Sequence, residues 1–323
     1  MARGRYDSGV SSANKPPLAV ILGAGRAVWG GLPSAVVDIP EHGRVLDWTL
    51  AALAALDEVE VRFVGGYRAE EVLQRYPEVQ IVLNPDWQHS GPAGSLSLAG
   101  LDAERQTYVV YSDVILRPQS VAALRDAPGQ LAVAVDSHWR SRYSDRSPAD
   151  LDHAEKVLFD GAAVQGIGRE LTTAAANAEL AGIVRFDPEA VQLVTAALAD
   201  GRLTEKATLP DIVALCLGAG LEVGAVDLEG DWAELDAKQD LARFILGTKA
   251  ESLERLRPMN HGGVIGAQVS FTAARWASEP AAITEQILAE LPGEKLIVRS
   301  SARSEDGWLE SGAGRYTSIL DVA

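Results

Sequence analysis

Residues 20–39 read VILGAGRAVWGGLPSAVVDI: an apolar run enters a glycine-rich turn, and a proline then precedes a second apolar run. Glycines let backbone N–H groups approach a phosphate closely, so this turn is a candidate phosphate-binding loop. The dinucleotide pattern G-x-G-x-x-G is only partly present, because Gly23 and Gly25 fit it and Val28 stands in the place of the third glycine. The loop favours a nucleotide site, with a tight strand-to-loop turn as the alternative.

Strand-like apolar runs alternate with segments whose apolar residues recur at helical spacing, from residue 17 to Asp136. This order predicts an α/β fold: a doubly wound, mostly parallel, Rossmann-like sheet with helices on both faces. In such a sheet the ligand binds beyond the carboxyl ends of the strands. The strands are expected at residues 17–23, 59–66, 79–85, 106–116 and 130–136, and the helices at 44–56, 68–76, 93–101 and 118–127.

The pattern changes after Asp136. Residues 137–187 contain short strands about a glycine turn, and we expect a partly antiparallel insertion on the substrate side. A late strand at 221–230 and a long helix at 238–256 follow, and Pro258 ends the helix because the residue before a proline disfavours helical geometry. The predicted organisation is a flexible tail at residues 1–15, an α/β domain at 16–257 and a small α+β piece at 258–323.

Composition limits the partners. The chain has 323 residues and a formal net charge of −16, so it lacks the basic surface that nucleic acid and membrane surfaces require, and neither is an expected partner. The single cysteine, Cys216, lies in an apolar helical pattern, which excludes a disulfide framework and fits a cytoplasmic protein. No apolar run is long enough to span a membrane. An acidic protein must neutralise an anionic nucleotide locally, through a metal ion or helix N-termini.

Four segments, in the same order between residues 18 and 248, resemble the nucleotidyltransferase family that joins a nucleoside triphosphate to a sugar phosphate, phosphocholine or a phosphonate. LGAGR followed by PSAVVDI resembles the family's opening loop, and NPDWQHSGPAGSLSLA resembles its base-recognition segment. VVYSDVIL resembles the strand whose end carries a metal-binding aspartate, and GDWAELDAKQDLARF resembles the segment that supplies a second one. The resemblance implies the family's fold and its reaction, in which pyrophosphate leaves.

By this resemblance Asp113 and Asp236 hold one Mg²⁺ ion. Magnesium prefers carboxylates together with phosphate and water, and it neutralises charge as pyrophosphate leaves. The alternatives are structural: Asp113 caps a turn, and Asp236 is the N-cap of the helix that follows it.

Two positions depart from the family pattern. Trp29 stands where an arginine is usual, and Ser34 stands where a lysine is usual. Cations at these places stabilise the negative charge that develops on the phosphates. Either Arg26 and another cation such as Lys156 take over this role, or the chain is a degenerate nucleotide-binding module that regulates or scaffolds an attached kinase. In the first case Arg26 is catalytic together with the two aspartates.

The base-recognition segment looks most like that of cytidylyltransferases acting on phosphocholine or small phosphonates, which favours CTP. A sugar-phosphate nucleotidyltransferase that uses UTP or GTP is the alternative. The acceptor is expected to be a small phosphorylated molecule held by the insertion, where Lys156, Arg140 and Arg142 would contact its phosphate and Glu179 an amino group. The residues expected to bind the nucleotide are Leu22, Gly23, Ala24, Gly25, Arg26, Ser34, Asn84, Ser90, Gly94, Ser95 and Asp113.

Residues 294–322, EKLIVRSSARSEDGWLESGAGRYTSILDV, resemble the first part of the ATP-binding domain of phosphoenolpyruvate synthase and pyruvate phosphate dikinase. The resemblance places Arg299 and Arg303 on ATP phosphates. The family's Gly-Gly-Lys opening is absent, and a complete kinase of this kind needs many more residues. We therefore expect this chain to be a fragment of a larger bifunctional protein, in which a kinase makes the phosphorylated acceptor. Glutamine phosphate is the specific acceptor expected for such a two-step pathway.

Overall fold

The structure is a computed structural model. It describes residues 15–26, 31–39, 43–143, 148–235, 244, 249–257, 262–271, 273–291, 293, 295–301 and 318–322. Internal contacts divide the chain into two compact units, Met1–Ala237 and Lys238–Ala323. This division lies before the predicted boundary at 257/258, so helix α9 (Lys249–Leu256) is grouped with the second unit. The predicted tail up to residue 14 lies outside the described residues, as do residues 238–243 and 245–248 of the helix expected at 238–256.

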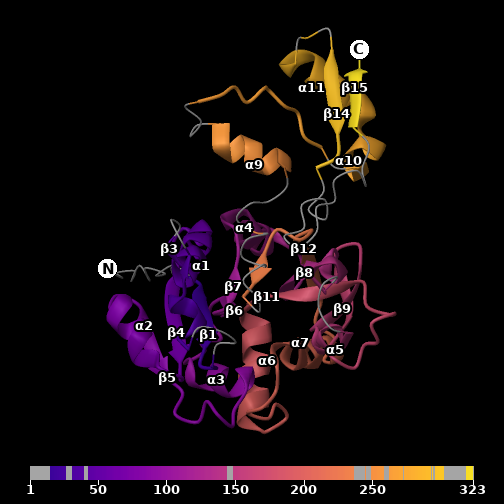
Figure 1. The fold of residues 1–323 in the computed structure, drawn as a ribbon. Helices are drawn as coiled ribbons and strands as arrows, with labels where there is room; N and C mark the ends of the chain where they lie inside the picture. The colour runs from indigo at the N-terminus through magenta and orange to yellow at the C-terminus, as the bar shows by residue number, and fades with distance from the viewer. Residues whose placement is uncertain are drawn as a thin grey trace, which may run out of the picture. The chain divides into compact units, whose positions relative to one another are not determined.

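A nine-stranded sheet runs through the described part of the first unit, in the order β5-β4-β1-β6-β11-β8-β12-β10-β9 (Figure 1). Strands β5, β4, β1 and β6 pair in parallel, and so do β8 and β12. Strand β11 lies between β6 and β8 and is antiparallel to both, so the sheet is mixed rather than mostly parallel. The strands are β1 Leu18–Gly23, β4 Glu60–Gly65, β5 Gln80–Leu83, β6 Thr107–Tyr111, β8 Leu131–Asp136, β9 Lys156–Asp160, β10 Ala163–Ile167, β11 Ala178–Phe186 and β12 Val223–Asp227.

Helices cover both faces of this sheet, as a doubly wound fold requires. Successive side chains of a strand point to opposite faces, and in β1 Leu18, Val20 and Leu22 join one apolar cluster while Ala19 and Ile21 join another. Helices α3, α6 and α7 contribute to the first cluster, and α1, α2 and α4 to the second. The helices are α1 Val45–Leu53, α2 Ala69–Arg75, α3 Pro92–Leu98, α4 Pro118–Asp126, α5 Pro148–His153, α6 Pro188–Ala199 and α7 Leu209–Gly218.

The starts of these helices follow from local sequence. Proline stands in the first turn of α3, α4, α6 and α7, where its fixed φ suits a helix and its missing N–H costs no hydrogen bond. At α7 the Thr208 hydroxyl accepts from the Asp211 N–H at 3.3 Å, and the Asp211 carboxylate accepts from the Thr208 N–H at 2.7 Å. This reciprocal cap satisfies two donors that the helix leaves unpaired.

Strand β11 connects the parallel half of the sheet to the predicted insertion. Along one edge its residues Ala178 and Glu179 pair with β9, while Ile183–Phe186 pair with β6. Gly182 lies between these two sets with a φ of +70°, and a Cβ there would lie 2.5 Å from Val114 Cγ1. A glycine is therefore needed where β11 passes from one neighbour to the other. The insertion is partly antiparallel, as the sequence predicts.

A second, two-stranded pairing was not expected from the sequence. Strand β7 (Val114–Ile115) directly follows Asp113, and it pairs antiparallel with β13 (Ala233–Glu234). This pairing brings the segment after β12 back to the end of β6. A further two-stranded sheet joins β2 (Asp38–Ile39) to β3 (Gly43–Arg44).

The second unit, described by itself, is a small α+β arrangement, in agreement with its sequence pattern. Helices α10 (Ala273–Ser278) and α11 (Pro280–Glu290) are followed by β14 (Leu296–Arg299), which pairs antiparallel with β15 (Ser318–Val322). Arg299 is exposed at the end of β14, and Arg303 lies outside the described residues. Across the described parts of both units, no helix has the length and apolar character that crossing a bilayer requires.

Candidate functional site

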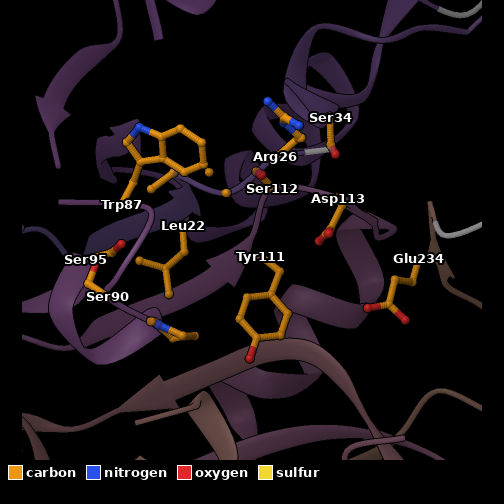
Figure 2. A pocket seen from close by; sticks show the side chains of 15 residues that line it. Leu22, Arg26, Ser34, Trp87, Ser90, Ser95, Tyr111, Ser112, Asp113 and Glu234 are labelled. Atoms are coloured by element: carbon orange, nitrogen blue, oxygen red, sulfur yellow. The ribbon is translucent and has the colours of Figure 1, made fainter. Parts of the chain in front are cut away.

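A pocket of about 280 Å³ lies at the carboxyl ends of β1 and β6, where the ligand of such a sheet is expected (Figure 2). All four segments that carry the family resemblance contribute to its lining, and the last of them contributes only Glu234. The lining residues are Leu22, Gly23, Ala24, Gly25, Arg26, Ser34, Trp87, Ser90, Gly91, Pro92, Ser95, Tyr111, Ser112, Asp113 and Glu234.

The loop after β1 forms one wall of this pocket. A Cβ on Gly23 would lie 2.2 Å from Phe63 Cζ, so this glycine is required by packing against β4. A Cβ on Gly25 would meet nothing within 4 Å, so the space beside Gly25 is open. The two glycines of the motif thus have different roles, and the second leaves room for a ligand near the backbone.

Arg26 is the only positively charged residue among the pocket residues that the structure describes, and two carboxylates, Asp113 and Glu234, also line the pocket. The Arg26 guanidinium lies over the ring of Tyr67, 5.0 Å from the ring centroid. Ser34, in the place of the family's lysine, also lines the pocket. Trp29 lies outside the described residues. The lining therefore has a net negative charge.

The predicted base-recognition residues form a hydrogen-bonded set on the opposite wall. The buried Asn84 amide donates to Ser90 Oγ at 2.9 Å and to Ser95 Oγ at 3.0 Å. Both serines line the pocket, whereas Asn84 and Gly94 do not. Asn84 therefore fixes the positions of two hydroxyl groups that line the pocket, although its own side chain does not line it.

Gly94 is explained by packing. A Cβ on Gly94 would lie 2.7 Å from Ser90 Cβ and 3.0 Å from the Glu205 carbonyl oxygen, which accepts a hydrogen bond from the Gly94 N–H at 3.0 Å. The small residue lets the start of α3 approach the chain at Glu205, and this contact keeps Ser90 and Ser95 in place.

The β7–β13 pairing brings the backbone segments of Asp113 and Glu234 side by side at the edge of the pocket. The Leu235 N–H donates to the Asp113 carbonyl oxygen at 2.8 Å, and Glu234 is paired with Val114 in the register. Both carboxylates line the pocket (Figure 2). Asp236, the predicted second metal ligand, lies outside the described residues.

Sequence reasoning missed Glu234. The signal was present: Glu234 stands two positions before Asp236, and residues two apart in an extended strand point to the same side. Two carboxylates in the lining of this pocket match the donor set of Mg²⁺, which takes one or two carboxylates and completes its shell with phosphate and water. Within the described residues no three His, Cys, Asp or Glu side chains are grouped to hold a metal by themselves. A metal ion held by Asp113 and Glu234 would therefore need oxygen ligands from phosphate or water.

Two of the predicted acceptor residues, Arg142 and Glu179, lie next to this edge and contact each other. Arg142 donates to Glu179 Oε2 at 2.9 Å and to Glu234 Oε2 at 3.1 Å, with its guanidinium 4.1 Å from the centroid of the Trp232 ring. The Tyr143 hydroxyl donates to the other oxygen of Glu179. Arg142 thus connects the acceptor-side carboxylate to the pocket carboxylate, an arrangement different from the phosphate contact expected for it.

Lys156 and Arg140 are engaged by backbone carbonyls. The buried Lys156 ammonium donates to the Asp152 carbonyl oxygen at 2.8 Å. Arg140 donates to the carbonyl oxygens of Thr173 and Ala176 at 2.6 and 2.8 Å. Neither residue lines the pocket, and Glu179 does not line it either. Their roles toward an acceptor stay predictions.

A protonatable carboxyl lies below the pocket floor. The Tyr111 hydroxyl, part of the lining, donates to both oxygens of Glu155 at 3.1 and 3.3 Å. The pKa of Glu155 is raised to about 7, chiefly by burial. The nearby Glu179 and Asp113 contribute to this rise, while the Tyr111 hydrogen bond and Arg169 oppose it. This carboxyl therefore changes charge near neutral pH.

No family model matches the chain. A CTP:phosphoglutamine cytidylyltransferase from Campylobacter jejuni is 21% identical over 219 residues, which are 62% of this chain and 87% of that protein.

Solved structures give the same class. The inositol-1-phosphate CTP transferase from T. maritima has a TM-score of 0.52 at 20% identity and covers 69% of this chain and 90% of its own. A CTP:phosphocholine cytidylyltransferase from Streptococcus pneumoniae has a TM-score of 0.52 at 19% identity and covers 71% of this chain and 97% of its own. The first unit therefore has the Rossmann-like α/β fold of nucleotidyltransferases, and the predicted α/β class is confirmed, with a mixed sheet in place of a mostly parallel one. The sequence relative and these two structures are named as CTP enzymes. A putative glucose-1-phosphate thymidylyltransferase from Bacillus anthracis has a TM-score of 0.53 at 15% identity and covers 76% of this chain and 98% of its own.

Proposed function

We propose that the chain transfers CMP from CTP to a small phosphorylated acceptor and releases pyrophosphate. The observation that carries this proposal is the composition of one pocket: the β1 loop with Arg26, the hydroxyl pair Ser90 and Ser95, and the carboxylate pair Asp113 and Glu234 all line it. A triphosphate, a base and a metal each find a complementary group there. The names of the similar proteins support CTP as the nucleotide.

Each wall has a distinct task in the proposed reaction. An oxygen of the acceptor's phosphate attacks the α-phosphorus of CTP, and the bond from that phosphorus to the bridging oxygen of pyrophosphate breaks. Arg26 and the loop N–H groups would bind the phosphates and stabilise the charge that develops on them. Asp113 and Glu234, with Asp236, would hold Mg²⁺. When bound, the ion neutralises charge on the triphosphate and on the leaving pyrophosphate.

The acceptor's identity is a finer proposal. Two carboxylates outside the lining are connected to lining residues: Glu155 through Tyr111, and Glu179 through Arg142, which also donates to Glu234. Glu179 also accepts a hydrogen bond from Tyr143. We propose an amino-acid phosphate such as phosphoglutamine, whose ammonium group would share the Glu179 carboxylate. Phosphocholine and small phosphonates are the other acceptors of this kind.

The second unit carries a further proposal. Its described strands, β14 ending at Arg299 and β15, agree with the strand–loop–strand order of the ATP-binding domain that its sequence resembles. We propose that residues 258–323 belong to such a domain and that the kinase makes the phosphorylated acceptor in a bifunctional protein.

A degenerate, non-catalytic module is the second candidate. One observation favours it: Arg26 is the only cation among the described pocket residues, while the lining has two carboxylates. Calorimetric titration with CTP, UTP and GTP, each with and without Mg²⁺, is the first test. The proposed function expects CTP to bind most tightly and to require Mg²⁺. Preference for UTP or GTP would favour the sugar-phosphate alternative, and absence of all binding would contradict nucleotide transfer. Tight CTP binding without any turnover would favour the module.

A further inference from the structure

We propose that Tyr67 is the residue that positions the phosphate loop and its single described cation, Arg26. Tyr67 lies in the turn between β4 and α2, outside every segment that carries the family resemblance, and it does not line the pocket. The proposal rests on the proposed function for its ligand, a nucleoside triphosphate, but the contacts that carry it are independent of which base is bound.

Tyr67 contacts the loop at three places. Its backbone N–H donates to the Ala24 carbonyl oxygen at 2.9 Å. Its ring lies under the Arg26 guanidinium at 5.0 Å, and its hydroxyl donates to the Gly31 carbonyl oxygen at 3.2 Å. Tyr67 therefore contacts the loop on both sides of residues 27–30: at Ala24 and Arg26 before them and at Gly31 after them.

The neighbours of Tyr67 support the same function. Arg68 adopts a φ of +47° and donates through Nη1 to the same Gly31 carbonyl oxygen at 2.7 Å. A Cβ on Gly66 would lie 2.7 Å from the Ala24 carbonyl oxygen and 2.5 Å from Trp87 Cβ. The turn approaches the loop this closely only because residue 66 has no side chain.

Tyr67 also links the loop to the opposite wall. Its ring packs edge-on against Trp87, with the centroids 5.6 Å apart and the planes at 62°, and Trp87 lines the pocket (Figure 2). Arg26 and Trp87 thus share one aromatic support. Any movement of Tyr67 would displace both.

The position of the guanidinium over the Tyr67 ring suits an arginine that must still bind phosphate. A guanidinium offers its flat face to an aromatic ring while its N–H donors point outward in the plane. Contact with Tyr67 therefore fixes the position of Arg26 and leaves its donors available for phosphate oxygens. With Ser34 in place of lysine, this single arginine supplies the charge that two residues supply in the family pattern, so its placement matters more here.

Two substitutions separate the contributions. Tyr67→Phe removes only the hydroxyl contact to Gly31, and we expect CTP affinity to fall about twofold to threefold, as for one exposed hydrogen bond. Tyr67→Leu also removes the ring beneath Arg26, and we expect a loss of about tenfold, from a cation–π contact together with the hydrogen bond. Tyr76→Phe is the matched control, since its hydroxyl donates to Asp47 at 2.7 Å away from the pocket lining; it should leave CTP affinity unchanged.

The readout that distinguishes positioning from general stability is the dependence on phosphate number. Calorimetry with CTP and with CMP should show a smaller loss for CMP, because CMP lacks the β- and γ-phosphates, and KM for the acceptor should not change. Equal losses for CTP and CMP, or wild-type CTP affinity in Tyr67→Leu, would overturn the inference.

A second readout needs no nucleotide. Amide hydrogen exchange in peptides covering residues 22–32 should be faster in Tyr67→Leu than in the wild type and unchanged in Tyr76→Phe. If the wild type bound no nucleotide, the proposed function would fail, and the exchange result alone would then decide whether Tyr67 holds the loop. Unchanged exchange in Tyr67→Leu would overturn the inference in that case too.

Discussion

The Leu235 N–H donates a 2.8 Å hydrogen bond to the carbonyl oxygen of Asp113. This bond extends the short pairing of β7 with β13, and it fixes the segment after β12 beside the end of β6. Glu234 consequently lines the same pocket as Asp113, although the two residues are far apart in the sequence (Figure 2). The candidate metal edge is thus made by backbone pairing, and the carboxylates are held by main-chain geometry.

Asp113→Asn should reduce turnover by at least about 100-fold and leave the fold intact, because the amide keeps the size of the carboxylate and loses the charge that would hold the metal. Pyrophosphate release and thermal unfolding of the same preparation measure both effects. Asp126→Asn, at an exposed position away from the pocket, is the control. A large drop in the midpoint of unfolding with retained specific activity would reassign Asp113 to a structural role.

Glu234→Gln should raise the Mg²⁺ concentration for half-maximal activity by about tenfold or more, the range for groups that support a metal site. A titration of activity with Mg²⁺ at saturating CTP measures it. Asp231→Asn is a matched control on the same segment: its carboxylate pairs with Arg117 at 2.9 Å and does not line the pocket. Equal shifts in the two variants would mean that the segment, rather than the Glu234 carboxylate, matters.

Arg26→Ala should cost about 100-fold in rate, as loss of one charge-stabilising donor typically does. The residue is the single described cation in a pocket lining with two carboxylates. Conversely, Ser34→Lys should tighten CTP binding, because it restores the charge that the family pattern has at this position. Steady-state kinetics and calorimetry test the pair. A silent Arg26→Ala variant would indicate that the loop is only a structural turn.

The free energy of unfolding should fall as the pH rises from about 4.5 to about 7, because the pKa of Glu155 is 4.5 as an ordinary glutamate and about 7 in the fold. Within this window the folded chain keeps a proton that the unfolded chain has released, so raising the pH favours unfolding. The effect is at most about 3 kcal/mol.

Urea unfolding across this range should show the decline in the wild type and a flatter profile in Glu155→Gln. Glu58→Gln removes an exposed carboxylate and should follow the wild type. A Glu155→Gln profile that declines as steeply as the wild type would assign the pH dependence to other groups.

The parallel half of the fold could be read from the sequence. Apolar runs such as Leu18–Gly23 and Leu131–Asp136 are buried along their whole length, and this produces a continuous apolar signal. The antiparallel position of β11 could not be foreseen, because strand order depends on long-range contacts that leave no periodic pattern. The need for glycine at position 182 is apparent only from the fold, which places Val114 against it.

Part of the site could also be predicted from the sequence, because some of its residues belong to local motifs. Local motifs identified the β1 loop, Ser90, Ser95 and Asp113, which all line the pocket. Glu234 was missed because the two-residue strand that carries it has no apolar pattern of its own, and its spacing of two from Asp236 was the one signal available. Arg142 pairs with Glu179 and Glu234, which come from segments that only the fold brings together, and its contact with an acceptor phosphate stays a prediction.

Pyrophosphate release is the most direct test of the proposed cytidylyl transfer. The purified chain would be incubated with each of the four nucleoside triphosphates, Mg²⁺, and phosphoglutamine, phosphocholine, a small phosphonate or a sugar phosphate, with EDTA and Asp113→Asn as controls. Cytidylyl transfer predicts pyrophosphate and a CMP-linked product in equal amounts with CTP and one phosphorylated acceptor, and both products should be abolished in the two controls. Pyrophosphate at or below the Asp113→Asn background for every combination, from a chain that is folded, would contradict it.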